Sequence, residues 1–202
     1  MPRAFTTHER ATITAALEQH GQRLFATQGL RKTTVDELAA AAGISKGAFY
    51  RFYASKEELF FTLLERFEAQ VQIALLALIA DPRLPPHERM RDLITHALDL
   101  MHAEPLFTRM GRAELAQLLR VLPPERVAAH VQGDETFAER FSAAWAAQGV
   151  SLSLPPKIVA GLLRALFFVS LHEDELSAAI YPVVIAELTD LVAGRLVGTR
   201  AE

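Results

Sequence analysis

The chain of 202 residues contains no cysteine. This absence excludes a disulfide-stabilised scaffold, a zinc site built on thiolates and a cysteine nucleophile. The apolar stretch without a charged residue at 69–80 is too short to span a bilayer. The N-terminus also carries charges where a secretory signal needs an apolar run. Half of the residues are hydrophobic and 22% are charged, so we expect a globular, cytoplasmic protein with no membrane partner.

Sequence motifs for catalysis are missing as well. The chain has no glycine-rich phosphate loop, no Gly-x-Ser-x-Gly elbow and no His-Glu-x-x-His pair. Its acidic residues scatter over the faces of predicted helices that we expect to point outward. The run from His172 to Glu175 could suggest a metal site, but consecutive loop residues converge poorly on one ion, and a solvated turn is expected instead. We therefore predict no enzyme activity, no cofactor and no metal.

Lysine is scarce and unevenly placed. Three of the four lysines lie within residues 1–57, which hold eight basic and five acidic side chains, a balance of +3. The remaining residues hold 13 basic and 19 acidic side chains, a balance of −6. A basic end on an acidic body is typical of a protein that presents that end to nucleic-acid phosphates.

Apolar residues recur with helical spacing along the whole chain, and no segment shows sustained strand alternation. Proline and glycine mark the breaks between these helical patterns. The sequence therefore predicts an all-α protein of about nine helices. The expected helices cover residues 7–28, 34–43, a short stretch from 45, 56–80, 86–103, 105–121, 124–148, 156–172 and 179–197.

Residues 33–56 (TTVDELAAAAGISKGAFYRFYASK) predict two short helices joined by a tight turn, followed by a third helix. Thr34 and Glu37 have the spacing of a capping box, and Gly43 suits a left-handed turn that a Cβ would strain. Ser45 and Ser55 are expected to cap the next two helices. Such a helix-turn-helix unit places one exposed helix where it can enter the major groove of DNA.

Burial of the unit against the first helix is expected to use its apolar side chains, namely Leu38, Ala39, Ile44 and Phe49. This leaves the polar and small residues of the second short helix on exposed or end positions. They are Lys46, Gly47, Ala48, Tyr50 and Arg51. Lys46 and Arg51 can reach guanine edges or phosphates, and Ala48 can touch a thymine methyl. Alternatively, Lys46 is only a solvated charge and Tyr50 only packs in the core.

Residues 8–66 resemble the N-terminal domain of the TetR family of transcriptional regulators. The matching positions are the run 13–25 with Gly29, Thr33-Thr34, Leu38-Ala39, 42–47, 49–53 and 55–59. The resemblance implies a DNA-binding domain at residues 1–55 and an effector-binding and dimerisation domain at 56–202. It also implies that Tyr50, Lys56 and the region of Thr34 contact backbone phosphates. For Thr34 and Ser45, a DNA contact would be a second role beside helix capping.

One position departs from the family pattern. A Tyr-x-His-Phe sequence is common there, whereas this chain reads Tyr50-Arg51-Phe52-Tyr53. Because Phe52 cannot donate a hydrogen bond, a phosphate contact at that position is doubtful, and Arg51 or Tyr53 is the expected substitute.

We call residues 1–55 the head and residues 56–202 the body, and two predictions concern the body. One head contacts few base pairs, so we expect a dimer that presents two heads to DNA. The very apolar helices at 156–172 and 179–197 would form its four-helix interface, or else they are simply core. The interface candidates are Leu162, Leu166, Val184, Leu188 and Leu191.

By resemblance, the middle helices should enclose a pocket for an effector. Its candidate lining residues, each of which could equally be plain core, are Phe67, Met101, Phe107, Met110, Phe137, Phe141, Trp145 and Phe168. His102 and His172 could orient such a ligand or could be ordinary polar residues at helix ends.

The predicted function is a ligand-responsive transcriptional regulator. It would repress by binding a palindromic operator in double-stranded DNA as a homodimer, and a small apolar effector would release it. The alternative is a DNA-binding structural or cell-cycle factor of the same fold without a small-molecule effector.

Overall fold

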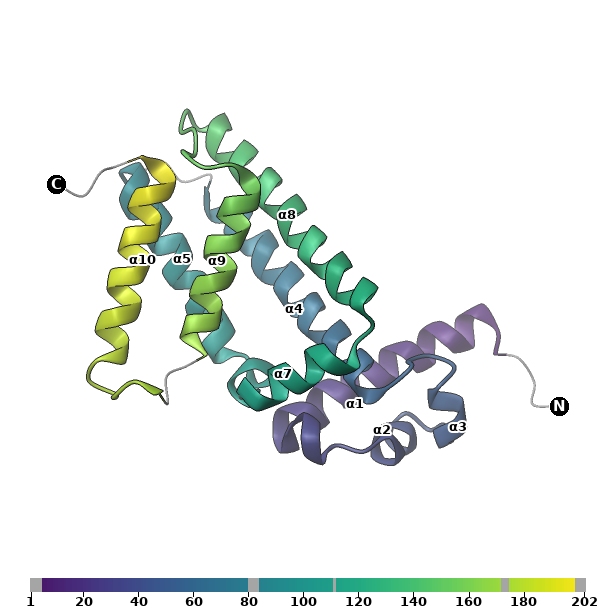
Figure 1. The fold of residues 1–202 in the computed structure, drawn as a ribbon. Coiled ribbons are helices and arrows are strands. Elements are labelled where there is room, and N and C mark those ends of the chain that lie inside the picture. Colours follow the sequence, from purple (N-terminus) through teal and green to yellow (C-terminus); the bar gives the residue numbers. More distant parts are fainter. Residues whose placement is uncertain (1–4, 80–83, 111, 172–174, 199–202) are drawn as a thin grey trace. The chain divides into compact units, whose positions relative to one another are not determined.

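The computed structural model describes residues 5–79, 84–110, 112–171 and 175–198. Within these ranges the chain is all-α, with ten helices and no strand (Figure 1). The all-α prediction is therefore confirmed. None of the helices in the described ranges is long and apolar enough to cross a membrane.

The tenth helix arises because the segment expected to be one helix at 105–121 forms two. Helix α6 (Pro105–Thr108) begins with the Glu104 carboxylate accepting from the Leu106 N–H at 3.2 Å. At its end the Met110 N–H donates to the Phe107 carbonyl, three residues back, which tightens the last turn and stops the helix. Helix α7 (Arg112–Val121) follows.

The chain forms two compact units. Unit 1 comprises residues 1–67 and 104–123, and unit 2 comprises residues 68–103 and 124–202. The long helix α4 (Lys56–Ile79) contributes its first half to unit 1 and its second half to unit 2. The functional division expected at residue 55 stays a prediction, because compactness does not report where a function ends.

In unit 1 the short helix α2 (Val35–Ala41) packs against the long helix α1 (Thr7–Lys32) and against the short helix α3 (Lys46–Phe49). The start of α4 lies against α1. The core of unit 1 is apolar and fully buried, and it includes Leu17, Phe25, Leu38, Phe49 and Leu59. α1 and α4 approach closely where α1 has Gly21, since a Cβ there would lie 3.1 Å from Leu59 Cδ2. Gly29 takes a left-handed conformation with φ of 79° near the expected end of α1, and one further turn follows.

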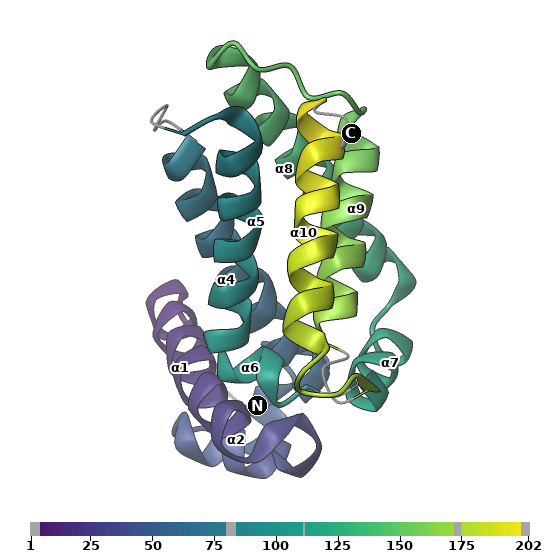
Figure 2. The same cartoon turned by 90° about the vertical axis from the view of Figure 1, so that its left-hand side faces the viewer.

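Unit 2 is a bundle of the second half of α4 with α5 (Pro86–Ala103), α8 (Pro124–Ala147), α9 (Pro156–Ser170) and α10 (Tyr181–Val197). α10 packs against α5 and α9, and α8 packs against α9 (Figure 2). Proline stands in the first turn of α5, α8, α9 and α10, where a missing N–H costs nothing. The Tyr181 hydroxyl, 2.9 Å from the Ser170 carbonyl and 3.2 Å from His102 Nε2, joins α10 to α9 and α5.

Candidate nucleic-acid interface

The helix-turn-helix is built from side-chain caps. Thr34 accepts from the Glu37 N–H, and the Glu37 carboxylate accepts from the Thr34 N–H at 2.8 Å, which completes the predicted capping box. These bonds from the Thr34 backbone, and then from its hydroxyl, lower the pKa of Glu37. Ser45 and Ser55 likewise accept from the N–H groups of Ala48 and Glu58. The N-terminus of each short helix is therefore determined by a capping side chain directly before it.

A tight turn joins α2 to α3. The N–H groups of Gly43 and Ile44 donate to the carbonyls of Ala40 and Ala39, and Gly43 has φ of 70°. A Cβ at Gly43 would meet nothing within 4 Å, so the need for glycine is conformational rather than steric. The turn sets the direction in which α3 leaves α2.

The short helix α3 buries Phe49 and exposes the polar side of the unit. Lys46 and Gly47 are exposed, Ala48 is half-buried, and Tyr50, just after the helix, is 51% exposed. The Tyr50 ring lies edge-on to Phe49 at 5.6 Å. Tyr50 is therefore not a core residue, and its hydroxyl end is free to meet DNA.

Lys46 is held by a neighbouring acid in this structure. Its ammonium lies 2.8 Å from Asp36 Oδ2 on α2, and this bond raises the pKa of Lys46. Both side chains are more than half exposed, so water and salt screen the pair strongly. A phosphate that bound Lys46 would compete with Asp36 for the same ammonium.

Lys56 lies in a different environment from the one that the resemblance implies. Its ammonium donates to the carbonyls of Leu30, Arg31 and Thr33 at 2.8, 3.3 and 2.7 Å. An ammonium has three N–H donors, so all of them are used on the main chain at the end of α1. In this conformation Lys56 has no donor left for a phosphate, and it ties the start of α4 to the segment that leads into α2.

Of the two expected substitutes for the missing donor at Phe52, only Arg51 is exposed. Tyr53 is buried, and its hydroxyl donates to Glu18 Oε1 at 3.2 Å. Burial, more than the Glu18 charge, raises the pKa of Tyr53.

This arrangement of caps, turn and exposed basic residues coincides with a family match. Residues 15–63 match the family described as "Bacterial regulatory proteins, tetR family". The chain belongs to the TetR family of transcriptional regulators. It is accordingly a DNA-binding regulator, and the resemblance predicted from residues 8–66 is confirmed.

Two curated regulators are similar over larger parts of the chain. The transcriptional repressor DhaR of Mycobacterium sp. (strain GP1) is 22% identical over 156 residues, which cover 77% of this chain and 79% of DhaR. The transcriptional regulator EthR of Mycobacterium tuberculosis is 34% identical over 101 residues, which cover 50% of this chain and 47% of EthR.

Among solved structures, the TetR-family repressor FadR of Thermus thermophilus, in complex with lauroyl-CoA, superposes with a TM-score of 0.64 at 22% identity. The superposition covers 96% of this chain and 95% of FadR. This likeness establishes the fold.

The predicted effector-lining residues fall into two groups, one in each unit. In unit 1 the rings of Phe67 and Phe107 lie 5.7 Å apart. Buried Met110 lines a shallow crevice. The empty space there is about 190 Å³, but this value includes open solvent, and no part of the crevice is wide enough to enclose a water molecule. The crevice lies among α1, α4, α6 and α7, where it is lined by Phe25, Gly29, Leu30, Phe60, Leu106, Arg109, Met110 and Glu114.

In unit 2, Phe137, Phe141 and Trp145 form a row of contacting rings along α8. Trp145 is fully buried and stacks under the guanidinium of Arg89 at 4.6 Å. Met101 is half-buried and Phe168 is 40% exposed. These positions suit core or surface packing as they stand, and their role in a pocket stays a prediction.

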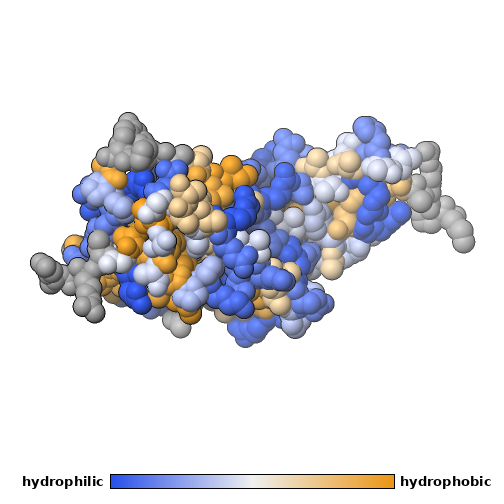
Figure 3. Space-filling view, turned by 90° about the horizontal axis from the view of Figure 1, so that it is seen from above, coloured by the Kyte–Doolittle hydropathy of each residue, from blue (hydrophilic) through white to orange (hydrophobic). Residues whose placement is uncertain are grey.

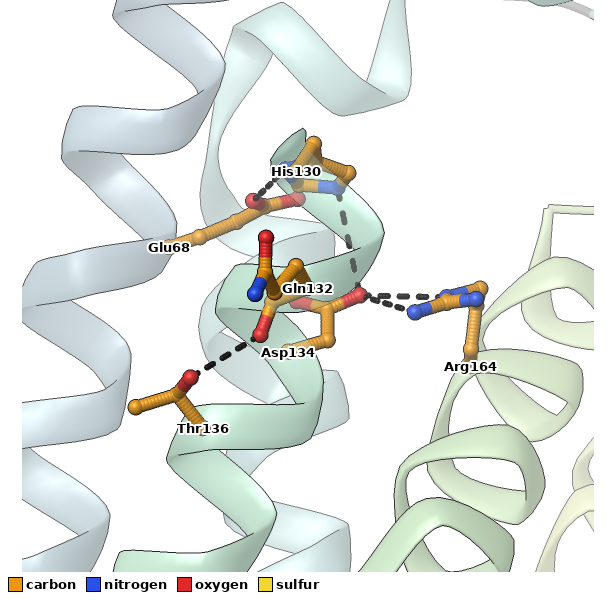
Figure 4. A network of polar contacts seen from close by, with 6 residues as sticks. All are labelled: Glu68, His130, Gln132, Asp134, Thr136 and Arg164. Atoms are coloured by element: carbon orange, nitrogen blue, oxygen red, sulfur yellow. Dashed lines mark hydrogen bonds and ion pairs between the residues drawn. The ribbon is translucent and has the colours of Figure 1, made fainter. Parts of the chain in front are cut away.

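A polar network in unit 2 was missed by the sequence analysis (Figure 4). Arg164 on α9 donates to Asp134 Oδ2 on α8 from Nε at 3.0 Å and from Nη2 at 2.6 Å. His130, one turn before Asp134, lies 4.0 Å from the same oxygen and 3.7 Å from Glu68 Oε2 on α4. The spacing of His130 and Asp134 was the only local signal, because Glu68 and Arg164 are remote in sequence.

None of this amounts to a metal centre within the described ranges, which hold no group of three or more His, Asp or Glu side chains able to hold an ion. His102 contacts the Ser170 carbonyl and the Tyr181 hydroxyl. His172 and its acidic neighbours, considered above for a metal or a ligand, lie outside the residues that the structure describes, apart from Glu175.

The predicted interface residues do not all lie on the surface of unit 2. Leu191 is 59% exposed and Leu162, Val184 and Leu188 are half-buried, but Leu166 is only 4% exposed and belongs to the core. An exposed stripe with helical spacing runs along each helix instead. It comprises Ile158, Gly161, Ala165 and Phe168 on α9, and Val183 and Leu191 on α10, with Ile180 just before α10 and the exposed Glu187 between Val183 and Leu191. In Figure 3 apolar surface gathers at the left of the view, over the C-terminal helices.

Proposed function

We propose that this TetR-family chain is a ligand-responsive repressor that binds a palindromic operator as a homodimer and is released by a small apolar effector. The observation that carries the DNA-binding part is the exposed end of the helix-turn-helix, where Lys46, Tyr50 and Arg51 stand clear of the core. The repressors DhaR and FadR support the sign of regulation.

The proposed DNA contacts divide into two kinds. Gly47 and Ala48, which are small, would let the backbone of α3 approach the base edges, where Lys46 supplies a charge, and Arg51 would reach a base edge or a phosphate. Tyr50 and Ser45 carry hydroxyl groups on exposed side chains and would bind backbone phosphates. Thr34 would do so only by exchanging the Glu37 carboxylate, to which its hydroxyl donates at 2.8 Å, for a phosphate. Lys56 is left out of this set, because its ammonium protons already bind three carbonyls.

Dimerisation is proposed from the exposed apolar stripes of α9 and α10. Apolar residues at this density on a surface mark an interface, and the occupant is a second copy, because a palindromic operator requires two heads. Gly161 and Ala165 lie in the middle of the α9 stripe. Small residues at such positions let two helices approach closely.

The effector is proposed to act through α4, the one helix shared by both units. That the same fold holds lauroyl-CoA, whose acyl chain is apolar, in FadR supports an effector with an apolar part here, at the level of the fold alone. A displacement of α4 would move Lys56 and the segment that it binds, and so change the position of the head. A coupling of about 1–3 kcal/mol is usual for such effects.

The test begins with the purified protein and a random library of duplex DNA. We expect repeated selection to yield a palindrome, and we expect the dimer to protect it in footprinting. A reporter controlled by that palindrome should rise when the gene for this protein is deleted. A fall would reverse the proposed sign, and selection of no duplex would overturn operator binding.

The effector is tested separately by screening two sets of compounds, small apolar molecules and acyl-CoA thioesters, for a rise in thermal stability. A true effector should also release the selected palindrome. If no compound does either, the alternative of a DNA-binding structural factor is favoured.

A further inference from the structure

Four side chains in unit 1 stack just after α3, in the order Arg51, Phe5, Phe52 and Arg10. The Arg51 guanidinium carbon lies 4.6 Å from the centre of the Phe5 ring. The Phe5 and Phe52 ring centres are 5.5 Å apart at an angle of 45°, and the Arg10 guanidinium carbon lies 4.9 Å over Phe52. We call this set the arginine–phenylalanine stack. It joins the residues just before and in the first turns of α1 to the residues that follow α3.

The start of α1 holds the stack in place. Thr6 caps α1 in a capping box with Glu9, whose carboxylate accepts from the Thr6 N–H at 2.7 Å. Phe5 occupies the position before the cap, whose apolar residue usually packs on the fourth helical residue. That residue here is the charged Arg10, and the Phe5 ring packs on Phe52 instead.

A hydrogen bond adds a second link. Arg10 Nη2 donates to the Arg51 carbonyl at 3.2 Å. Phe52 cannot donate a hydrogen bond to a phosphate, but its ring packs directly against Arg10. Through the Phe5 ring it also supports Arg51.

Both arginines keep most of their donors. Stacking uses the face of a guanidinium and leaves its in-plane N–H groups at the edge. Arg51 therefore keeps five N–H donors, and Arg10 keeps four after its bond to the carbonyl. Both side chains are exposed, and neither forms an ion pair with a carboxylate in the described part of the chain. Two oriented cations without acidic partners suit a phosphate backbone.

We propose that Phe5 and Phe52 are positioning residues that hold Arg51 and Arg10 against the DNA backbone, beside the recognition helix. The pair of arginines then makes the phosphate contact that Phe52 cannot make. The proposal rests on the DNA-binding function and adds Arg10 and Phe5, which lie outside the helix-turn-helix itself.

The first experiment measures binding of a duplex selected by the wild-type protein, by fluorescence anisotropy between 50 and 200 mM KCl. Arg51→Ala and Arg10→Ala should each weaken binding roughly tenfold, and each should lower the slope of log K against log salt by about 0.9 per head. Arg140→Ala removes an exposed arginine of α8 and is the charge-matched control, with unchanged slope and affinity. An unchanged slope in both stack variants would overturn the proposal.

The second experiment separates positioning from simple packing. Phe5→Leu keeps an apolar side chain but removes the aromatic face, and it should weaken binding about threefold to fivefold, whereas Phe5→Tyr should bind like wild type. In an Arg10→Ala/Arg51→Ala background, Phe5→Leu should have no further effect. Equal affinities of the Leu and Tyr variants, or additive losses in this cycle, would overturn the positioning role.

Two controls make these results decisive. The thermal midpoint of Phe5→Leu should stay close to that of wild type, since Phe5 is only half-buried. A wild-type protein that selects no duplex would overturn the DNA-binding function itself and the stack with it. Wild-type binding with unaffected stack variants would overturn the stack alone.

Discussion

The helix-turn-helix of unit 1 and the helical bundle of unit 2 are held together in different ways. In the helix-turn-helix, short polar side chains cap the helices by accepting a hydrogen bond from the backbone N–H three residues later, as Thr34, Ser45 and Ser55 do. In the bundle, polar contacts join different helices, as between Arg164 and Asp134 or Tyr181 and Ser170. The first region is determined locally and the second by tertiary packing. The exposed surfaces differ in the same way, since the head presents cations and the bundle presents apolar stripes.

The largest effect should come from placing a charge in the apolar stripe of the bundle. Leu191→Glu should convert a dimer into a monomer and reduce operator affinity by more than about 100-fold, because one head makes half of the contacts. Light scattering measures the mass.

The matched control is Ile73→Glu on α4, because Ile73 is 66% exposed but lies on neither α9 nor α10. It should stay dimeric. A wild-type monomer, or equal dissociation in the two variants, would refute the interface.

A smaller loss is expected from the head. Lys46→Ala should weaken operator binding about tenfold with an unchanged helical circular-dichroism signal, because an exposed side chain is removed. Asp36→Asn should act in the opposite direction, since it frees Lys46 from a competing carboxylate. Unchanged binding in both variants would remove Lys46 from the interface.

Lys56 should affect folding more than DNA binding. Lys56→Met leaves the three carbonyls at the end of α1 without their donor and should lower stability by about 1–3 kcal/mol. The salt slope of DNA binding should not change. A lower slope with unchanged stability would show that Lys56 contacts phosphate after all.

The smallest effect concerns the pH dependence of the capping box. The hydrogen bonds from Thr34 lower the pKa of Glu37 in the folded state below 4.5. Its contribution to stability is thus present above the unfolded pKa and is lost as the pH falls through the folded value. Thermal midpoints of wild type and Glu37→Gln should differ at pH 6 and converge as the pH falls through the folded pKa. A difference that does not shrink as the pH is lowered from 4.5 would contradict the assignment.

Much of the head could be predicted from sequence because its signals are local. The capping residues, the left-handed Gly43 and the buried Leu38 and Phe49 lie within a few residues of the structures they determine. Lys56 shows where such reasoning stops, since the resemblance predicts a phosphate contact for it, whereas its ammonium binds carbonyls more than 20 residues away. The stack of Phe5 on Phe52 has the same origin, in residues that are distant in sequence.

By itself, the sequence determined the helical class, the helix boundaries at caps and prolines, the DNA-reading unit and the family. These depend on spacing and on bonds that span three or four residues. Only the tertiary structure decided which apolar residues of α9 and α10 face solvent, that Lys56 binds the main chain, and that Phe52 lies against Arg10 and Phe5. The physical reason is that a side chain's partner across the fold is chosen by how helices pack, and helical spacing alone does not encode that choice.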